Sequence, residues 1–270
     1  MTDHAEWDFP NTATPPGSAP YYVARFSPPR QRDALARWLA WFAHIDAIAA
    51  RANDPGVARL KLDWWREEVG HMLGNSARHP LARALSPQVA SAWQVEQMQR
   101  ALHAVEQRIL KRQPATLEQF HRQCADQHAS RLRLLCDTDD AGLAEHIETM
   151  GTYLATIQRL QQLATDLRDD YLSLPADKLA EQQLTAEQLR SAEALPQLAE
   201  LAQQLIASAG PCDSAYLKSL GRHQALQPAL RCAAQSLRLA RLMQRQRFAL
   251  NRRRSELTPL GLLWSARRMR

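Results

Sequence analysis

Residues 145–170 read EHIETMGTYLATIQRLQQLATDLRDD, and this stretch decides the fold class. It contains no Pro, and no Gly follows Gly151. Its apolar residues recur at steps of three and four positions: Ile147, Met150, Leu154, Ile157, Leu160, Leu163 and Leu167. This spacing predicts a long helix with one buried face, because a helical turn takes three to four residues.

Three carboxylates, Asp166, Asp169 and Asp170, stand at the end of this stretch. If the helix continues through residue 170, Asp166 and Asp170 lie one turn apart on the same face, with Asp169 beside them. Such hard oxygen ligands suit Mg²⁺ bound together with the phosphates of a substrate. The other interpretation is a solvated acidic helix end with Arg168 as its counter-ion, since short acidic patterns often have no function.

The rest of the chain also favours helices. Ala, Leu, Gln and Arg dominate, and only 9 of the 270 residues are Gly. We find no alternating strand pattern and no repeat of fixed period, so we predict an all-α protein. Besides 145–170, helices are expected at about residues 29–50, 60–73, 87–112, 116–136, 185–189, 196–207, 213–224 and 228–254.

Proline content marks a different N-terminal segment. Residues 1–20 contain Pro10, Pro15, Pro16 and Pro20 among polar residues, which predicts a flexible arm. The helical domain is then expected to span residues 21–256, and residues 257–270 form a basic C-terminal tail.

The four cysteines are expected to be reduced core residues of a cytoplasmic protein. Cys124, Cys136, Cys212 and Cys232 are far apart, with no pair at metal-ligand spacing. No apolar run approaches the roughly 20 residues that span a bilayer, and the N-terminus lacks a signal-peptide pattern.

Arginines are concentrated near the C-terminus. Arg231, Arg238, Arg245 and Arg252 recur at seven-residue steps, and the tail combines Trp264 with further arginines. With a net charge of +6, this pattern predicts a surface that meets an anionic membrane or an acidic protein, with the protein peripheral on the inner membrane surface. We do not expect nucleic acid as a partner, because no recognition motif accompanies the charge.

Three stretches together resemble the squalene and phytoene synthase family. They are Tyr21-Tyr22-Val23-Ala24 with Pro28-Pro29, Arg32 and the helix after it; Trp64-Trp65-Arg66-Glu67-Glu68 within residues 60–69; and residues 166–175. The likeness runs from about residue 20 to 246. It implies a single isoprenoid-synthase-like helical bundle with a central cavity, in which two aspartate-rich helices hold Mg²⁺ against a prenyl diphosphate.

The resemblance also implies roles for individual residues. Asp46, Asp166, Asp169 and Asp170 would bind the metal, with Asp46, Asp166 and Asp170 catalytic in an active enzyme. The substrate would be bound by Tyr22, Arg32, Gln162, Asp169 and Tyr171. With only Asp46 opposite the second aspartate motif, Mg²⁺ is expected to bind weakly without diphosphate, because it gives up its waters reluctantly.

The first aspartate motif departs from the family pattern. Ala47 and Ala50 stand where active enzymes carry carboxylates, and Ala43 stands where they carry an arginine. Losing such charge-stabilising groups should be costly for the departure of diphosphate. The loop after the second motif also lacks the family's arginine-rich flap.

These departures resemble a divergent branch related to a phytoene-synthase-like mitochondrial complex I assembly factor, with Cys124–Ser130 as the closest segment. Two functions stay open. One is a non-catalytic homologue that binds a lipid or a protein, and the other is a Mg²⁺-dependent prenyltransferase that condenses two prenyl diphosphates head to head.

Overall fold

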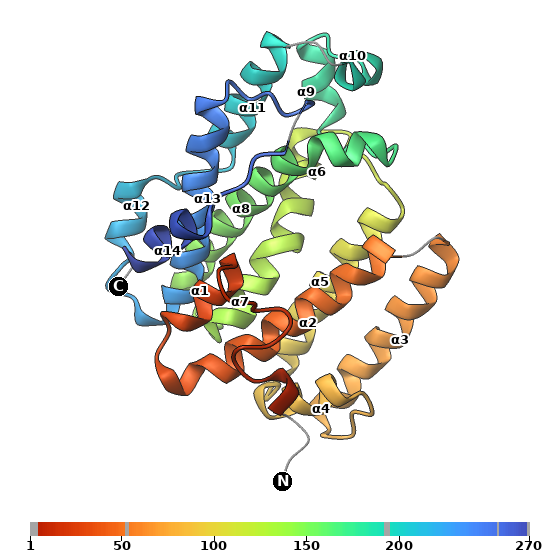
Figure 1. Ribbon diagram of the computed structural model, residues 1–270. Coiled ribbons are helices and arrows are strands. Elements are labelled where there is room, and N and C mark those ends of the chain that lie inside the picture. The colour runs from red at the N-terminus through yellow and green to blue at the C-terminus, as the bar shows by residue number, and fades with distance from the viewer. Residues whose placement is uncertain (1–4, 52–53, 192–194, 253, 269–270) are drawn as a thin grey trace.

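The computed structural model describes residues 5–51, 54–191, 195–252 and 254–268. Within these ranges the chain is all-helical, as predicted, and contains no strand. Figure 1 shows α2 and α3 along one side of the bundle and α11 to α14 along the other, with α6, α7 and α8 between them. None of the helices in the described ranges combines the length and apolarity that crossing a bilayer requires.

The first half of the chain builds the α2 side of the bundle. Its helices are α1 (Ala19–Arg25), α2 (Arg32–Arg51), α3 (Pro55–Leu73), α4 (Pro80–Leu85), α5 (Ala92–Ile109), α6 (Leu117–Cys124) and α7 (Ser130–Cys136). The π-helical segment η4 (Ala125–Ala129) joins α6 to α7 without a break. Short 3₁₀ turns occupy η1 (Ala5–Trp7), η2 (Pro29–Gln31) and η3 (Ser86–Gln88).

The second half supplies the central helix and the opposite side. Its helices are α8 (Ala141–Arg168), α9 (Ala176–Glu181), α10 (Ala186–Arg190), α11 (Pro196–Ser208), α12 (Ser214–Ser219), α13 (Gln227–Arg245) and α14 (Pro259–Arg267), with the 3₁₀ turn η5 at Gln224–Leu226. The apolar stripe predicted for α8 is buried along its whole length.

Side-chain caps fix several of the predicted helix starts. Thr116 accepts a hydrogen bond from the backbone N–H of Gln119, and Thr185 and Gln188 form a reciprocal capping box at α10. Asp213 caps α12 in the same way. These residues satisfy backbone N–H groups that have no partner inside the helix, which is why a sequence pattern can predict them.

Helix ends were predicted less well. The helix expected at 145–170 stops at Arg168, and the one expected at 228–254 stops at Arg245. Arg247 and Phe248 both adopt positive φ angles, of 54° and 49°, which no right-handed helix contains. Helices α1, α4 and α9 have no counterpart in the prediction, because each is only six or seven residues long.

The N-terminal segment differs from the flexible arm expected from its prolines. Asp8 accepts two hydrogen bonds from Arg37 on α2, at 2.9 and 2.7 Å. Asn11 donates to the backbone carbonyl of Ala36, and Thr14 is completely buried. Residues 8–11 are therefore held against α2, and the aromatic rings of Trp7 and Phe9 pack against the hydrophobic core. Residues 1–4 lie outside the described ranges.

The closest helix contact in the bundle is between α8 and η4. A Cβ atom added to Gly151 of α8 would lie 2.5 Å from the backbone N and Cα atoms of Ala129. Only a glycine permits this approach, and it brings the π-helical segment directly onto α8. The contact therefore sets the position of Gln127, His128 and Arg131 relative to α8.

We expect Gly151→Ala to lower the free energy of unfolding by about 1–3 kcal/mol or more, because the added methyl group has no space. Gly70→Ala is the matched control. Gly70 lies on the exposed side of α3 with no atom within 4 Å of an added Cβ, so alanine should raise stability by about 0.5–1 kcal/mol. Urea denaturation of both variants would measure the difference, and equal effects would contradict the close contact.

Candidate functional site

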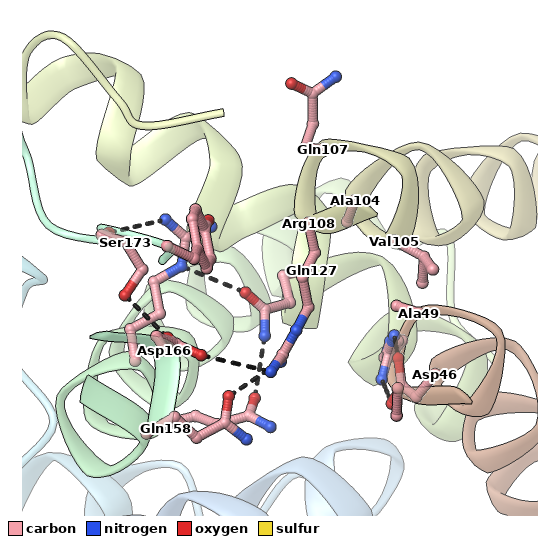
Figure 2. A pocket seen from close by; sticks show the side chains of 15 residues that line it. Asp46, Ala49, Ala104, Val105, Gln107, Arg108, Gln127, Gln158, Asp166 and Ser173 are labelled. Atoms are coloured by element: carbon pink, nitrogen blue, oxygen red, sulfur yellow. Dashed lines mark hydrogen bonds and ion pairs between the residues drawn. The ribbon is translucent and has the colours of Figure 1, made fainter. Parts of the chain in front are cut away.

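A polar pocket of about 220 Å³ lies between α2, α5, η4, α7 and α8. Figure 2 shows its side chains converging from these elements. It is lined by Asp46, Ala49, Ala50, Ala104, Val105, Gln107, Arg108, Gln127, Arg131, Gln158, Arg159, Gln162, Asp166, Tyr171 and Ser173. Three arginines and two aspartates supply all of its formal charge, so the pocket carries one net positive charge.

Asp46 of α2 forms a bidentate ion pair with Arg131 of α7. The two N–O distances are 2.7 and 2.6 Å. The Arg131 side chain is 10% exposed, whereas that of Asp46 is half-exposed at the rim. Burial by itself would raise the pKa of Asp46, but the charge and hydrogen bonds of Arg131 outweigh burial and hold this pKa below its usual range. Asp46 is therefore a carboxylate whose charge is already neutralised.

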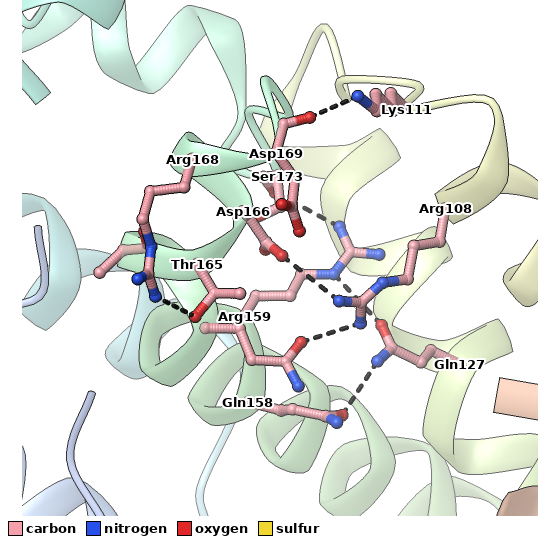
Figure 3. A network of polar contacts seen from close by, with 12 residues as sticks. Arg108, Lys111, Gln127, Gln158, Arg159, Thr165, Asp166, Arg168, Asp169 and Ser173 are labelled. Atoms are coloured by element: carbon pink, nitrogen blue, oxygen red, sulfur yellow. Dashed lines mark hydrogen bonds and ion pairs between the residues drawn. The ribbon is translucent and has the colours of Figure 1, made fainter. Parts of the chain in front are cut away.

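Asp166 on α8 is the second carboxylate, and it faces Arg108 of α5 at 3.4 Å. Ser173 donates a hydrogen bond to its other oxygen at 3.0 Å, and Arg108 also donates to Gln162 at 2.9 Å (Figure 3). The side chain of Asp166 is 4% exposed. Burial raises its pKa despite the opposing effects of Arg108 and Ser173.

Arg159 of α8 forms the back of the pocket and is held by neutral groups. It donates to the side-chain oxygens of Gln123 and Gln127, at 3.1 and 3.3 Å, and to the backbone carbonyl of Ser173 at 3.4 Å. Its guanidinium also lies 5.2 Å from the ring centre of Phe120. No carboxylate among the described residues forms a salt bridge with it, although its charge acts on nearby Asp166, so neutral hydrogen-bond partners fix it in place.

The π-helical segment contributes Gln127 to the lining of the pocket, and His128 lies next to it on the same segment. Gln127 donates to Gln158 of α8 at 3.0 Å, and His128 contacts the same Gln158 oxygen. Burial lowers the pKa of His128 to about 4, helped by the charge of Arg131. The imidazole is therefore neutral at physiological pH. A π-helical turn at this point fits the general association of such turns with functional sites.

Four of the residues predicted for the site do line the pocket: Asp46, Asp166, Gln162 and Tyr171. They come from α2, α8 and the loop after α8. The prediction of two aspartate-bearing helices that share one cavity therefore agrees with the geometry of these four residues.

Asp169 and Asp170 do not join them, because α8 ends at Arg168. Asp169 is exposed, and its backbone carbonyl accepts a hydrogen bond from Lys111. Asp170 adopts a positive φ of 55° and pairs with Arg190 on α10. The expected cluster of three carboxylates required a helix that continues through residue 170, and the left-handed turn prevents it.

Tyr22 and Arg32 also lie outside the lining of the pocket. Tyr22 is buried in α1 and stacks on Phe26, with ring centres 6.1 Å apart. Arg32 donates to the backbone carbonyl of Ser27 at 3.2 Å, which ties the start of α2 to the end of α1. Arg32 therefore joins the two N-terminal helices, whereas Tyr22 packs within α1.

The three arginines of the pocket were not among the site residues predicted from the sequence. Arg108 and Arg131 come from α5 and α7, where no local pattern distinguishes them from surface arginines. Arg159 had a usable signal, since Gln158, Gln162 and Asp166 recur at four-residue steps and form a polar stripe next to it on an otherwise apolar helix.

The donor set does not fit a magnesium cluster. Within the described ranges, no group of three or more His, Cys, Asp and Glu side chains is placed to hold a metal ion. The pocket's two carboxylates each face a guanidinium, so a metal ion would have to displace Arg131 from Asp46 and Arg108 from Asp166. Arginine cannot lose its proton to make this easier.

A second, apolar cavity of about 630 Å³ adjoins the polar pocket. Arg131 lines both spaces. The cavity is bounded by α1, α2, α7, α8, α13 and residues 254–262, and its apolar lining includes Val23, Phe42, Leu132, Leu135, Leu154, Leu239, Leu257 and Leu262. The protein thus has a charged space and an apolar space on either side of one guanidinium.

We expect Asp46→Asn to lower the free energy of unfolding at pH 7 by about 1 kcal/mol, a value that allows for solvent screening of the half-exposed carboxylate. The pKa of Asp46 is lower in the folded than in the unfolded protein. Its contribution is therefore complete above the usual carboxyl pKa of about 4 and is lost as the pH falls through the lowered value.

Urea denaturation across the acid range would measure the difference between wild type and variant, which should disappear in strong acid. Asp170→Asn is the control, because its side chain is 85% exposed and should contribute nothing measurable. A difference that persists at the acid end would contradict the assignment.

Comparisons with known proteins show the fold and the family of the chain. In solved structures, a dehydrosqualene synthase in complex with a ligand superimposes with a TM-score of 0.76 at 17% identity, covering 93% of this chain and 90% of that one. The squalene synthase HpnC from Alicyclobacillus acidocaldarius gives 0.69 at 19% identity, covering 84% and 88%. These likenesses show the isoprenoid-synthase-like fold. No curated protein sequence matches the chain. The squalene/phytoene synthase family model matches residues 15–260, and the chain therefore belongs to this family.

Proposed function

We propose that this protein is a non-catalytic member of the family that binds an anionic isoprenoid-type lipid. The head group would occupy the polar pocket and the chain would occupy the apolar cavity. The observation that carries the proposal is that both pocket carboxylates are already paired with arginines, Asp46 with Arg131 and Asp166 with Arg108.

The charge of the pocket supports an anionic head group. Arg159 is held by glutamines and a backbone carbonyl, so its charge remains available to a ligand. Guanidinium groups bind phosphate and carboxylate oxygens through paired N–H donors. The same groups make the pocket unfavourable for Mg²⁺, on which the departure of a diphosphate depends in related chemistry.

The apolar cavity supports a ligand with a long hydrocarbon chain. Its volume lies within the usual range for small-molecule sites, and apolar residues make up twelve of the twenty that line it, seven of them Leu. Because Arg131 borders both spaces, one amphiphile could contact the guanidinium with its head group and the leucines with its tail. The likeness of residues 124–130 to the assembly-factor branch is consistent with binding without turnover.

The alternative is a prenyltransferase that condenses two prenyl diphosphates. One observation favours it, since Asp46 and Asp166 do line one pocket. This activity would need Mg²⁺, and the described arrangement offers the metal no free set of carboxylates. We therefore rank this alternative second.

Calorimetry with farnesyl diphosphate in the presence of EDTA tests the proposal. We expect binding without Mg²⁺, and Arg108→Gln should weaken it about tenfold or more, since a hydrogen bond to a charged group contributes about 1.5–3 kcal/mol. Arg168→Gln is the matched control. It removes the same charge from the end of α8, but among the described residues this side chain bonds only Ala164 and Thr165 of its own helix, so affinity should not change.

A second variant tests whether the hydrocarbon chain of the ligand occupies the apolar cavity. Ser236→Phe fills part of the apolar cavity from α13. It should therefore weaken the binding of farnesyl diphosphate but leave the binding of inorganic diphosphate unchanged. Incubation with farnesyl and geranylgeranyl diphosphates and Mg²⁺ should yield no condensed product. Formation of a squalene- or phytoene-type hydrocarbon, or binding that requires Mg²⁺, would establish the alternative instead.

A further inference from the structure

Charge is distributed very unevenly along the chain. Residues 214–270 contain 13 of the 34 Lys and Arg residues but only one, Glu256, of the 28 Asp and Glu residues. The preceding 213 residues carry 21 basic and 27 acidic side chains, so they are net negative. The net charge of +6 is thus the difference between an acidic body and a strongly basic C-terminal segment. Such a separation orients a protein toward an anionic surface.

The structure corrects which arginines form this basic face. Arg231 is buried and donates a hydrogen bond to Ser27 at 3.1 Å, so it belongs to the core. Arg238, Arg241 and Arg245 of α13 are exposed. Arg241 donates to the Ser214 hydroxyl at 2.8 Å.

Arg267 and Arg268, at the end of α14, are also exposed and belong to the same basic face. None of the salt bridges found in the described ranges involves Arg238, Arg241, Arg245, Arg267 or Arg268. Since their charges are not neutralised by neighbouring carboxylates, they are available to an external anionic partner.

Helix α14, which the sequence suggested only as a tail, has two distinct faces. Gly261, Ser265 and Ala266 are buried against the bundle. Leu260 and Trp264 are 69% and 53% exposed, although both are large and apolar. They lie four positions apart, and Arg267 and Arg268 follow one turn later, so the outward face presents Leu, Trp and Arg in one stripe.

We propose that α14 and the exposed arginines of α13 form a docking surface for an anionic phospholipid membrane. Trp and Leu side chains gain by entering the interface between head groups and acyl chains, and each basic residue near an anionic leaflet adds about 1 kcal/mol. α14 is too short to span a bilayer, so the protein lies on the surface. Leu257 and Leu262 line the apolar cavity from the same segment, so a docked protein would hold that cavity beside the bilayer. Entry of a lipid into the cavity from the bilayer would rest on the proposed function.

A second exposed apolar stripe occurs on α3, on the opposite side of the bundle (Figure 1). Val57 and Leu60 are 48% and 70% exposed. The charges of this helix balance, because Arg59, Lys61 and Arg66 are matched by Asp63, Glu67 and Glu68. An anionic membrane has no comparable attraction to this side, which makes α3 the matched control for α14.

Vesicle flotation tests the docking surface without any prenyl ligand. Protein should float with phosphatidylcholine vesicles that contain phosphatidylglycerol, and not with phosphatidylcholine alone. Added salt should release it. Leu260→Gln and the double variant Arg267→Gln/Arg268→Gln should each weaken binding about tenfold or more. Leu60→Gln changes an equally exposed leucine on α3 and should bind like the wild type.

Three outcomes would overturn the proposal: equal flotation with neutral vesicles, equal losses for Leu60→Gln and Leu260→Gln, or no flotation at all. Salt-sensitive binding to polyglutamate without flotation would identify an acidic protein as the partner instead. Thermal unfolding of each variant checks that it is folded. Because no prenyl ligand is present, failure here leaves the proposed function standing, and failure of farnesyl diphosphate binding leaves the docking surface standing.

Discussion

The ion pair between Asp46 and Arg131 is the constraint on which the site depends. It joins α2 to α7 across 85 residues of sequence, and Arg131 also packs over the ring of Phe42 at 5.4 Å. Arg131 in turn separates the polar pocket from the apolar cavity. Breaking this pair would leave a guanidinium that is nine-tenths buried without its counter-ion, at a cost of about 1 kcal/mol because the lost carboxylate is half-exposed. The pair therefore fixes both the charge of the pocket and its boundary.

The same residue type behaves differently at the two ends of the pocket. Asp46 has a strong bidentate partner, and its pKa is held low. Asp166 has a longer contact with Arg108 and is deeply buried, so its pKa is raised. The two carboxylates thus differ because Arg131 contacts Asp46 more closely than Arg108 contacts Asp166.

The sequence predicted the all-α class, the buried stripe of α8 and the family, because these depend on local periodicity and on short motifs. It also placed Asp46 and Asp166 in one site. It misplaced Asp169 and Asp170, because a left-handed residue ends α8 and no glycine or proline signals this. It missed Arg108 and Arg131, whose role depends on contacts with residues 58 and 85 positions away. Such contacts arise from packing, which local patterns do not encode.

Burial also explains why the basic face could be predicted only roughly. The seven-residue spacing of Arg231, Arg238 and Arg245 suggests one exposed row, yet a helix that packs on α8, α1 and α14 exposes only part of its surface. Arg231 lies at the buried end and forms a core hydrogen bond to Ser27, whereas Arg238 and Arg245 lie further along the exposed side. The absence of any acidic residue between Asp213 and Glu256 is the stronger signal, because it does not depend on where each side chain points. A long segment without carboxylates cannot neutralise itself locally, so its charge must be balanced by carboxylates from the rest of the fold, by solvent ions or by a partner.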